Sequence, residues 1–143
     1  MRLEGKVALI TGGARGMGAV GAKLFAREGA KVVIGDLLEE EGRQVEAEIA
    51  EAGGEAMFVR LDVTREDDWR EAVDQAVSKF GKLNVLVNNA GISSRSHPDI
   101  SSLEGWELIM EVNSKGVFLG TTYAIPKFLE AGGGSIVNIS SIL

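Results

Sequence analysis

The sequence predicts an α/β fold in which helices cover both faces of a doubly wound parallel sheet. Short apolar runs alternate with longer segments whose apolar residues recur at helical spacing. Glycines stand in clusters at the joints between these segments. Such alternation requires right-handed crossovers, which place helices on both faces of the sheet. We therefore expect a five-stranded sheet with the strand order 3-2-1-4-5.

The first half of the chain contains three predicted strands separated by two helices. The strands are the runs at residues 7–10, 31–36 and 56–63, and their apolar character is typical of parallel strands buried on both faces. The helices span residues 16–28 and 38–52. Each is followed by glycine, which favours the left-handed backbone found at a helix C-terminus.

The third predicted helix has the clearest apolar periodicity. Thr64 is expected to cap its N-terminus, with Asp67 three residues on as a variant of the capping box. Gly81 ends the helix, and a fourth strand follows at residues 83–87. The inward face of the helix is formed by Trp69, Ala72, Val73, Ala76, Val77 and Phe80.

A long helix and a fifth strand complete the alternation. The helix is expected to begin at Ser101 or Ser102, and Pro126 is expected to kink or break it. The fifth strand, at residues 135–140, would form an apolar edge of the sheet, which native proteins usually cover. We therefore expect residues 1–143 to form a single domain that is truncated after this strand.

Composition argues against several classes of function. The net charge is −6, whereas a nucleic-acid-binding protein needs a basic surface. The sequence contains no cysteine and one histidine, so we expect no disulfide, no cysteine nucleophile and no metal site built from thiolates or several histidines. No apolar run near the start is long enough for a signal peptide or a membrane span. These features predict a cytoplasmic protein without membrane contact.

The turn after the first strand is a glycine-rich loop suited to binding phosphate. Gly12, Gly16 and Gly18 allow a sharp turn and a close approach of the backbone to a ligand. The following helix presents free N–H groups and a partial positive charge to an anion. The spacing G-x-x-x-G-x-G predicts a dinucleotide pyrophosphate site that also includes Arg15 and Met17. A glycine-rich turn without a ligand is the alternative.

Asp36 ends the second predicted strand, 18 residues after Gly18. Dinucleotide-binding folds carry an acidic residue about 20 residues after the glycine motif, where it binds the adenosine ribose 2′-hydroxyl. A strand-end aspartate can instead cap the next helix. Asp36 would repel the 2′-phosphate of NADP and Leu37 supplies no cation, whereas Arg15 would attract that phosphate. Taken together, these side chains favour NAD over NADP as the cofactor.

Four motifs resemble those of the classical short-chain dehydrogenases/reductases, the SDR family of Rossmann-fold oxidoreductases. Residues 11–18 resemble the T-G-x-x-x-G-x-G turn of that family, and residues 88–91 match its N-N-A-G. Asn113 matches its catalytic asparagine, and Ser141 matches its catalytic serine. The resemblance covers the whole chain, in order, and corresponds to the N-terminal part of family members such as hydroxysteroid and cyclic-alcohol dehydrogenases.

This resemblance implies NAD(H)-dependent interconversion of a secondary alcohol and a ketone, both small molecules. It implies that Ser141 polarises the substrate oxygen and that Asn113 anchors a water in a proton relay. Each residue also has a structural interpretation: Ser141 as an ordinary loop serine, and Asn113 as a buried asparagine hydrogen-bonded to backbone. The resemblance adds further cofactor contacts at Asp62, Val63, Asn89, Ala90 and Gly91.

In the SDR family, a proton-transferring Tyr-x-x-x-Lys pair lies on the helix after the catalytic serine. Tyr123 and Lys127 have the same spacing but precede Ser141, so we interpret the match as accidental and expect this chain alone to be inactive. Two hypotheses remain: part of an NAD-dependent alcohol dehydrogenase, or a non-catalytic module that binds nucleotide or a partner. The family also pairs its long helix, here residues 103–126, across a dimer axis, which implies a homodimer or homotetramer of the full-length enzyme.

Overall fold

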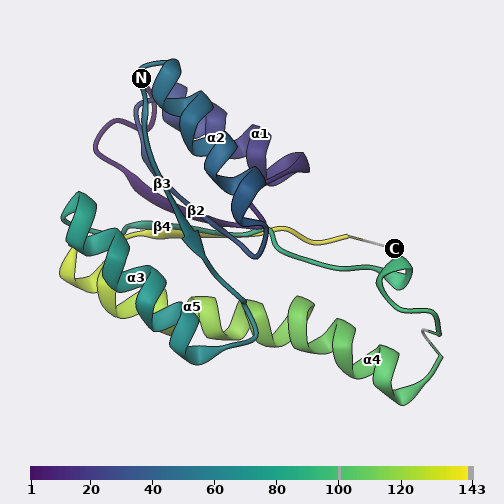
Figure 1. Ribbon diagram of the computed structural model, residues 1–143. Helices are drawn as coiled ribbons and strands as arrows, with labels where there is room; N and C mark the ends of the chain where they lie inside the picture. Colours follow the sequence, from purple (N-terminus) through teal and green to yellow (C-terminus); the bar gives the residue numbers. More distant parts are fainter. Residues whose placement is uncertain (100, 142–143) are drawn as a thin grey trace.

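Five parallel strands form one sheet in this computed structural model, which describes residues 1–99 and 101–141. The strands are β1 (Val7–Thr11), β2 (Lys31–Asp36), β3 (Glu55–Arg60), β4 (Val85–Asn88) and β5 (Ser135–Asn138). Their order across the sheet is β3-β2-β1-β4-β5, which confirms the predicted topology (Figure 1). The strand order therefore reverses between β1 and β4, and ligands of doubly wound sheets bind at such a switch point.

Helices cover both faces of the sheet. The helices α1 (Gly16–Arg27) and α2 (Glu39–Glu51) lie on one face, and α3 (Glu66–Phe80) and α5 (Gly116–Glu130) lie on the other (Figure 1). A short helix α4 (Leu103–Met110) precedes α5, follows the 3-10 turn η1 (Ser94–Ser96) and projects beyond the sheet. No helix within residues 1–99 and 101–141 is long and apolar enough to cross a membrane.

Two apolar layers hold the helices to the sheet, because successive strand residues point to opposite faces. In β1, Ala8 and Ile10 pack with the alanines of α1 and with Val45 and Ile49 of α2. Val7 and Leu9 of β1 belong to the layer on the side of α3 and α5, with the fully buried Trp69. The periodicity predicted for residues 69–80 is confirmed, since every residue of the predicted inward face is buried or partly buried against this layer.

Two glycines of α5 allow that helix to lie very close to its neighbours. A Cβ at Gly116 would lie 2.8 Å from Cγ2 of Val63, and one at Gly120 would lie 2.7 Å from the Trp69 ring. Both distances are shorter than real Cβ contacts. Larger residues would push α5 away from Trp69 and from the turn that follows β3.

The structure corrects the predicted boundary between the third strand and the third helix. β3 ends at Arg60, and the N-cap of α3 is Arg65, which makes no side-chain cap, so the prediction of Thr64 as the cap is wrong. The Thr64 hydroxyl instead donates to Oδ1 of Asp62 at 2.7 Å, and the Thr64 N–H donates to the same atom at 2.9 Å. Local bonding from an aspartate to the backbone two residues on competes with both strand and helix.

The long helix also differs from the prediction at two places. Ser102 is confirmed as its cap, because its hydroxyl accepts the N–H of Gly105 at 3.0 Å. The helix does not break at Pro126, which lies inside α5. The irregularity lies earlier, where the π-helical segment η2 (Glu111–Lys115) joins α4 to α5. Such π segments are frequent at functional sites.

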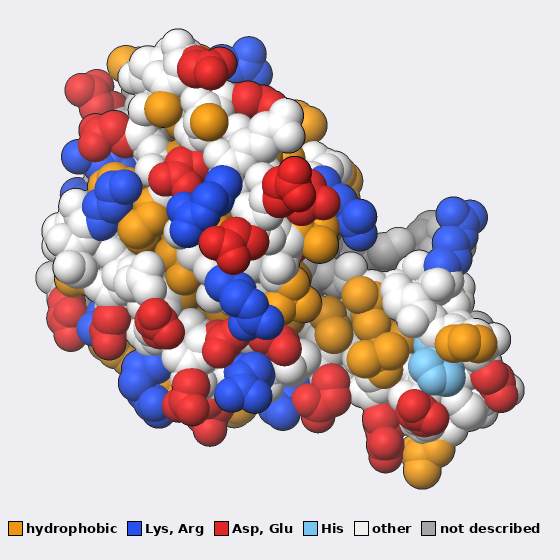
Figure 2. All heavy atoms as spheres, viewed as in Figure 1, with side chains coloured by type: hydrophobic (Ala, Val, Ile, Leu, Met, Phe, Trp, Pro, Cys, Tyr) orange, Lys and Arg blue, Asp and Glu red, His pale blue; other side chains and the backbone are white. Residues whose placement is uncertain are grey.

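Exposed apolar side chains gather on the part of the molecule that α4 forms (Figure 2). Leu103 and Trp106 are exposed there, and Phe118 near the start of α5 is 66% exposed. Basic and acidic side chains are interspersed over the rest of the same view (Figure 2).

Candidate functional site

The predicted site residues follow the carboxyl ends of the parallel strands. β1, β2 and β4 end at Thr11, Asp36 and Asn88, and the segments after them lie at one edge of the sheet because the strands run in the same direction. β5 brings Ser141 to the same edge, three residues beyond Asn138. The Asn88 side chain donates to Oδ1 of Asn138 at 2.9 Å, which links β4 and β5 at this point.

The glycine-rich turn needs its glycines for two different reasons. Gly12 and Gly16 have φ angles of +64° and +57°, which residues with a Cβ rarely adopt. Gly18 has no such angle, but a Cβ there would overlap the carbonyl oxygen of Gly12. The first turn of α1 therefore folds directly onto the loop before it, and only glycine fits the contact.

The N-terminus of α1 is open to an anion. Arg15 occupies the N-cap position without a side-chain cap, and the first turn of α1 contains no acidic residue. The first turns of α2 and α3, by contrast, are acidic. A Cβ at Gly16 would meet nothing within 4 Å, so the outer side of the turn is unobstructed. Free N–H groups and the helix dipole favour negative charge at this position.

Asp36 is bonded to the glycine-rich turn. Its Oδ2 accepts the N–H of Ala14 at 3.0 Å, and its Oδ1 accepts the N–H of Leu38, the N-cap residue of α2, at 3.1 Å. Asp36 therefore does not cap α2, whose N-cap residue is Leu38 and has no side-chain cap. The bond to Ala14 places the carboxylate beside the loop. The apolar side chains of Met17 and Leu37 are exposed by 72% and 52% in the segments on either side.

The second of the two adjacent asparagines connects the glycine-rich turn to β4. Nδ2 of Asn89 donates to the carbonyls of Thr11 and Gly12 at 3.0 and 3.3 Å. The Thr11 hydroxyl accepts the N–H groups of Asn89 and Ala90 at 3.0 and 2.9 Å. This role of Thr11 was not predicted from the sequence, although its position directly before the glycines was a signal. These bonds fix the relative position of the two loops that border the predicted pyrophosphate site.

Asn113 lies in the π-helical segment and is bonded to the segment after β4. Its Oδ1 accepts the N–H of Ile92 at 2.8 Å, and its Nδ2 donates to the carbonyl of Ile92 at 2.7 Å. A Cβ at Gly91 would lie 3.3 Å from Oδ1 of Asn113. The expected bond to backbone is therefore observed, but Asn113 is exposed and the expectation that it is buried is wrong. The bond brings η2 next to residues 89–91.

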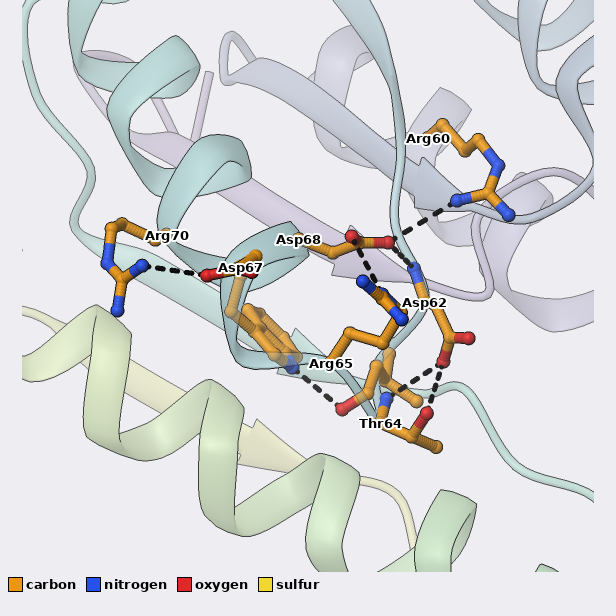
Figure 3. A network of polar contacts seen from close by, with 9 residues as sticks. Arg60, Asp62, Thr64, Arg65, Asp67, Asp68 and Arg70 are labelled. Atoms are coloured by element: carbon orange, nitrogen blue, oxygen red, sulfur yellow. Dashed lines mark hydrogen bonds and ion pairs between the residues drawn. The ribbon is translucent and has the colours of Figure 1, made fainter.

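Asp62 lies in the turn between β3 and α3 (Figure 3), and Val63 follows it in the same turn. Asp62 accepts the two Thr64 bonds described above, and its own N–H donates to Oδ2 of Asp68 at 2.9 Å. The Val63 side chain is buried, and its carbonyl accepts the indole N–H of Trp69 at 2.9 Å. Leu61, directly before this turn, connects it to the end of β2, because the Leu61 N–H donates to the carbonyl of Asp36 at 3.0 Å.

Tyr123 and Lys127 face α3 and not the carboxyl edge of the sheet. The Tyr123 hydroxyl donates to Oε1 of Glu66 at 2.9 Å and accepts from Arg70 at 3.3 Å. Nζ of Lys127 lies 3.0 Å from Oδ1 of Asp74. The hydrogen bond to that carboxylate raises the pKa of the Lys127 ammonium above its ordinary value. Both residues therefore take part in contacts between helices.

Two further polar features lie away from the predicted site. Asn84, which the sequence analysis did not single out, is buried, and its Oδ1 accepts the N–H of Val7 at 2.8 Å. A groove of about 680 Å³ opens at the amino ends of β2 and β3, the opposite edge of the sheet. Its lining includes Lys23, Glu48 and Lys31, and Lys23 and Glu48 form an ion pair across it.

With this geometry established, comparison with known proteins identifies the family. Residues 6–143 match the short chain dehydrogenase family, and the chain belongs to it. It is 54% identical over 142 residues to 2,5-dichloro-2,5-cyclohexadiene-1,4-diol dehydrogenase LinX of Sphingobium indicum, covering 99% of this chain and 57% of that protein.

Two other relatives show the same partial coverage. The chain is 54% identical to 3-alpha-(or 20-beta)-hydroxysteroid dehydrogenase of Mycobacterium tuberculosis, with 99% of the chain and 53% of that protein covered. It is 48% identical to cyclopentanol dehydrogenase of Comamonas testosteroni, with 99% and 56% covered. The chain thus spans about half the length of the curated relatives it matches.

Proposed function

We propose that residues 1–143 form the nucleotide-binding domain of an NAD(H)-dependent oxidoreductase that interconverts a secondary alcohol and a ketone. The observation that carries this proposal is the hydrogen bond from the Ala14 N–H to Asp36. It joins, at one edge of the sheet, a turn suited to pyrophosphate and a carboxylate suited to ribose hydroxyls. Family membership supports the same chemistry.

The residues present fit a dinucleotide. The unobstructed turn at Gly16 and the N-terminus of α1 would hold the pyrophosphate, with Met17 and Gly18 in the same turn. Asp36, with Leu37 beside it, would accept hydrogen bonds from the adenosine ribose. The purine would lie against the turn at Asp62 and Val63, and the other end of the dinucleotide would pass Asn89, Ala90 and Gly91.

NAD is the proposed cofactor in preference to NADP. Both oxygens of Asp36 already accept backbone N–H groups, so the carboxylate is held at the strand end. A 2′-phosphate would meet a fixed charge of like sign, which is costly. The side chain of Arg15 is exposed at the N-cap of α1 and is free of the capping role, so it can reach the pyrophosphate as well as the ribose.

The chain also supplies two of the residues that the reaction would need. A bound nicotinamide would exchange a hydride with the substrate carbon. Ser141 would donate a hydrogen bond to the substrate oxygen, stabilising charge that develops there. The Asn113 side chain is engaged with Ile92, so a water held at this residue would bond to its backbone carbonyl. The whole enzyme would pair through its long helix as a homodimer or homotetramer.

The proposed substrates are small cyclic secondary alcohols and the corresponding ketones. The three relatives named above are dehydrogenases of a cyclohexadienediol, a hydroxysteroid and cyclopentanol. A hydroxyl group carried on a ring is the chemistry that these names share. The particular alcohol would be selected by residues that contact its ring.

Substitution of Met17 tests the proposed pyrophosphate site. Met17 is 72% exposed in the first turn of α1, where a carboxylate stabilises the helix but repels a bound anion. Met17→Glu should therefore fold at least as well as the wild type and weaken NAD binding about tenfold, or about 1.4 kcal/mol. Calorimetric titration with NAD measures the effect, and Met17→Gln is the neutral control of similar shape.

Two results would contradict the proposal. One is a wild-type chain that does not bind NAD in the millimolar range. The other is a Met17→Glu variant that binds NAD as tightly as Met17→Gln, because the pyrophosphate would then not lie at the N-terminus of α1.

A further inference from the structure

We infer that Asp68 is a positioning residue for the adenosine half of the dinucleotide, an inference that rests on the proposed function. Asp68 lies in the first turn of α3, and no motif of the sequence analysis includes it. Its carboxylate is largely buried, with 18% of the side chain exposed. It holds the turn that carries Asp62 and Val63 (Figure 3).

The central contact is the hydrogen bond from the Asp62 N–H to Oδ2 of Asp68, at 2.9 Å. Two guanidinium groups approach the same carboxylate from either side. Nη1 of Arg60 lies 3.4 Å from Oδ2, and Nε of Arg65 lies 3.5 Å from Oδ1 (Figure 3). Both arginines are exposed, so their ion pairs add little to stability. They flank the carboxylate, whose Oδ2 accepts the Asp62 N–H.

The next residue of α3 holds the other side of the turn. The Trp69 indole donates to the carbonyl of Val63 at 2.9 Å from inside the core. Asp68 and Trp69 together therefore hold the peptide group before Asp62 and the peptide group after Val63. With the turn fixed, the two bonds from Thr64 leave the carboxylate of Asp62 in one orientation.

The position of the turn determines which half of a dinucleotide would depend on Asp68. The turn follows β3, and its Leu61 N–H donates to the carbonyl of Asp36, the proposed ribose-binding residue. The pyrophosphate turn and residues 89–91 are connected to each other by Thr11 and Asn89 and make no use of Asp68. Loss of Asp68 should therefore weaken binding of the adenosine half and leave the nicotinamide half unaffected.

The experiment compares two overlapping fragments of the cofactor as separate ligands. ADP-ribose is the dinucleotide without its nicotinamide and so contains the adenosine, whereas nicotinamide mononucleotide lacks the adenosine. Asp68→Ala should weaken ADP-ribose binding about tenfold, or about 1.4 kcal/mol, and leave nicotinamide mononucleotide binding unchanged. Asp68→Asn keeps an oxygen acceptor for the Asp62 N–H and should restore ADP-ribose binding to within about threefold of the wild type, or about 0.65 kcal/mol.

Asp67→Ala is the matched control. Asp67 precedes Asp68 in the same acidic first turn, is 77% exposed and pairs with Arg70, away from Asp62. Its removal costs the same charge in the same turn of α3 and should not change ADP-ribose binding. Hydrogen exchange of the Asp62 amide gives a readout without ligand, and it should be faster in Asp68→Ala only.

The possible results separate this inference from the proposed function. A wild-type chain that does not bind ADP-ribose overturns both. A folded Asp68→Ala variant that binds ADP-ribose like the wild type, or that loses both ligands equally, overturns the role of Asp68 alone. If Asp68→Ala does not fold, the Asp68→Asn variant is used in its place. Faster hydrogen exchange of the Asp62 amide in that variant, combined with unchanged ADP-ribose binding, would overturn the role of Asp68 because the turn would then not need to be held.

Discussion

At the scale of single residues, Asp36 combines a structural role with a proposed recognition role. Its two oxygens each accept a backbone N–H, one from the glycine-rich turn and one from the start of α2. Each oxygen of a carboxylate has a second lone pair, so ribose hydroxyls can still bind. Removal of the side chain would therefore change both the selectivity and the shape of the site.

Replacement of Asp36 by Ala should weaken NAD binding about tenfold or more, or at least about 1.4 kcal/mol. The ratio of the NADP to NAD affinities should rise, because the like charge facing the 2′-phosphate is gone while Arg15 remains. The absolute affinity for NADP should rise less than this ratio, since the Ala14 N–H loses its acceptor. Dissociation constants for both cofactors measure the effect.

Glu39→Ala is the control for this change. It removes one carboxylate from the exposed first turn of α2, where Glu39 pairs with Arg43. It should leave both dissociation constants unchanged. A wild-type preference for NADP, or an unchanged ratio in Asp36→Ala, would contradict the assignment of Asp36.

At the scale of secondary-structure elements, α1 depends on the absence of a side chain where it meets its own loop. A Cβ at Gly18 would overlap the Gly12 carbonyl, whereas a Cβ at Gly21, in the same helix, meets nothing within 4 Å. Gly18→Ala should lower the free energy of unfolding by about 1–3 kcal/mol. Gly21→Ala should raise it by up to about 1 kcal/mol, since alanine is the better helix former.

Urea unfolding of the two variants checks this prediction. Both variants are Gly→Ala changes in one helix, so the gain in helix propensity cancels in the difference between their free energies of unfolding. That difference therefore reports the contact of residue 18 with Gly12. Equal stabilities would show that α1 can move away from the loop at little cost.

The sheet and its helices were predictable because each depends on local pattern. Continuous apolar runs predicted the buried strands, and period-3.6 spacing predicted the face of α3 that surrounds Trp69. The prediction failed where a side chain had a choice of partners. Thr64 has a side chain that can cap a helix, but its hydroxyl is hydrogen-bonded to Asp62 and α3 begins at Glu66. The π segment at Asn113 depends on a bond to Ile92 that no local pattern shows.

Part of the geometry of the candidate site was predictable as well. The sharp turn at Gly12 and Gly16 and the strand-end position of Asp36 are visible in the sequence, whereas their roles in binding stay predictions. The bonds made by Thr11 and Asp68 could not be predicted. The bond from Asn89 to Thr11 joins residues 78 positions apart, and that from Asp62 to Asp68 depends on where α3 begins. Neither contact follows from a local sequence pattern.

At the scale of the whole molecule, exposed apolar side chains follow the long helix. Leu103, Trp106, Phe118 and Leu129 are exposed by 71%, 56%, 66% and 75% along α4 and α5. Apolar exposure on this scale is typical of an interaction surface. We expect the chain to self-associate through this helix, and Phe118→Lys should shift it toward monomer in sedimentation velocity. Val20→Lys, at an equally exposed position on α1, should not.

The remaining whole-molecule prediction concerns catalysis by this chain alone. A dehydrogenase of this type needs a group that transfers the hydroxyl proton, and general acid–base help is worth roughly 10²–10⁴-fold in rate. Tyr123 is the one tyrosine of the chain, and its hydroxyl is bonded to Glu66 and Arg70 on the outer side of α3. Lys127 is paired with Asp74. Neither side chain faces the edge where the cofactor would bind.

The chain should therefore bind NAD without oxidising alcohols. Titration should show saturable binding, while incubation with NAD and cyclopentanol or cyclohexanol should produce no NADH above the uncatalysed rate. The absorbance of NADH measures turnover, and the mass of the purified chain must be verified because a longer form could be active. Steady turnover that disappears in Tyr123→Phe but persists in Tyr123→His would contradict this prediction. It would show that residue 123 transfers a proton, and it would overturn the interpretation of Tyr123 as only a contact between α3 and α5.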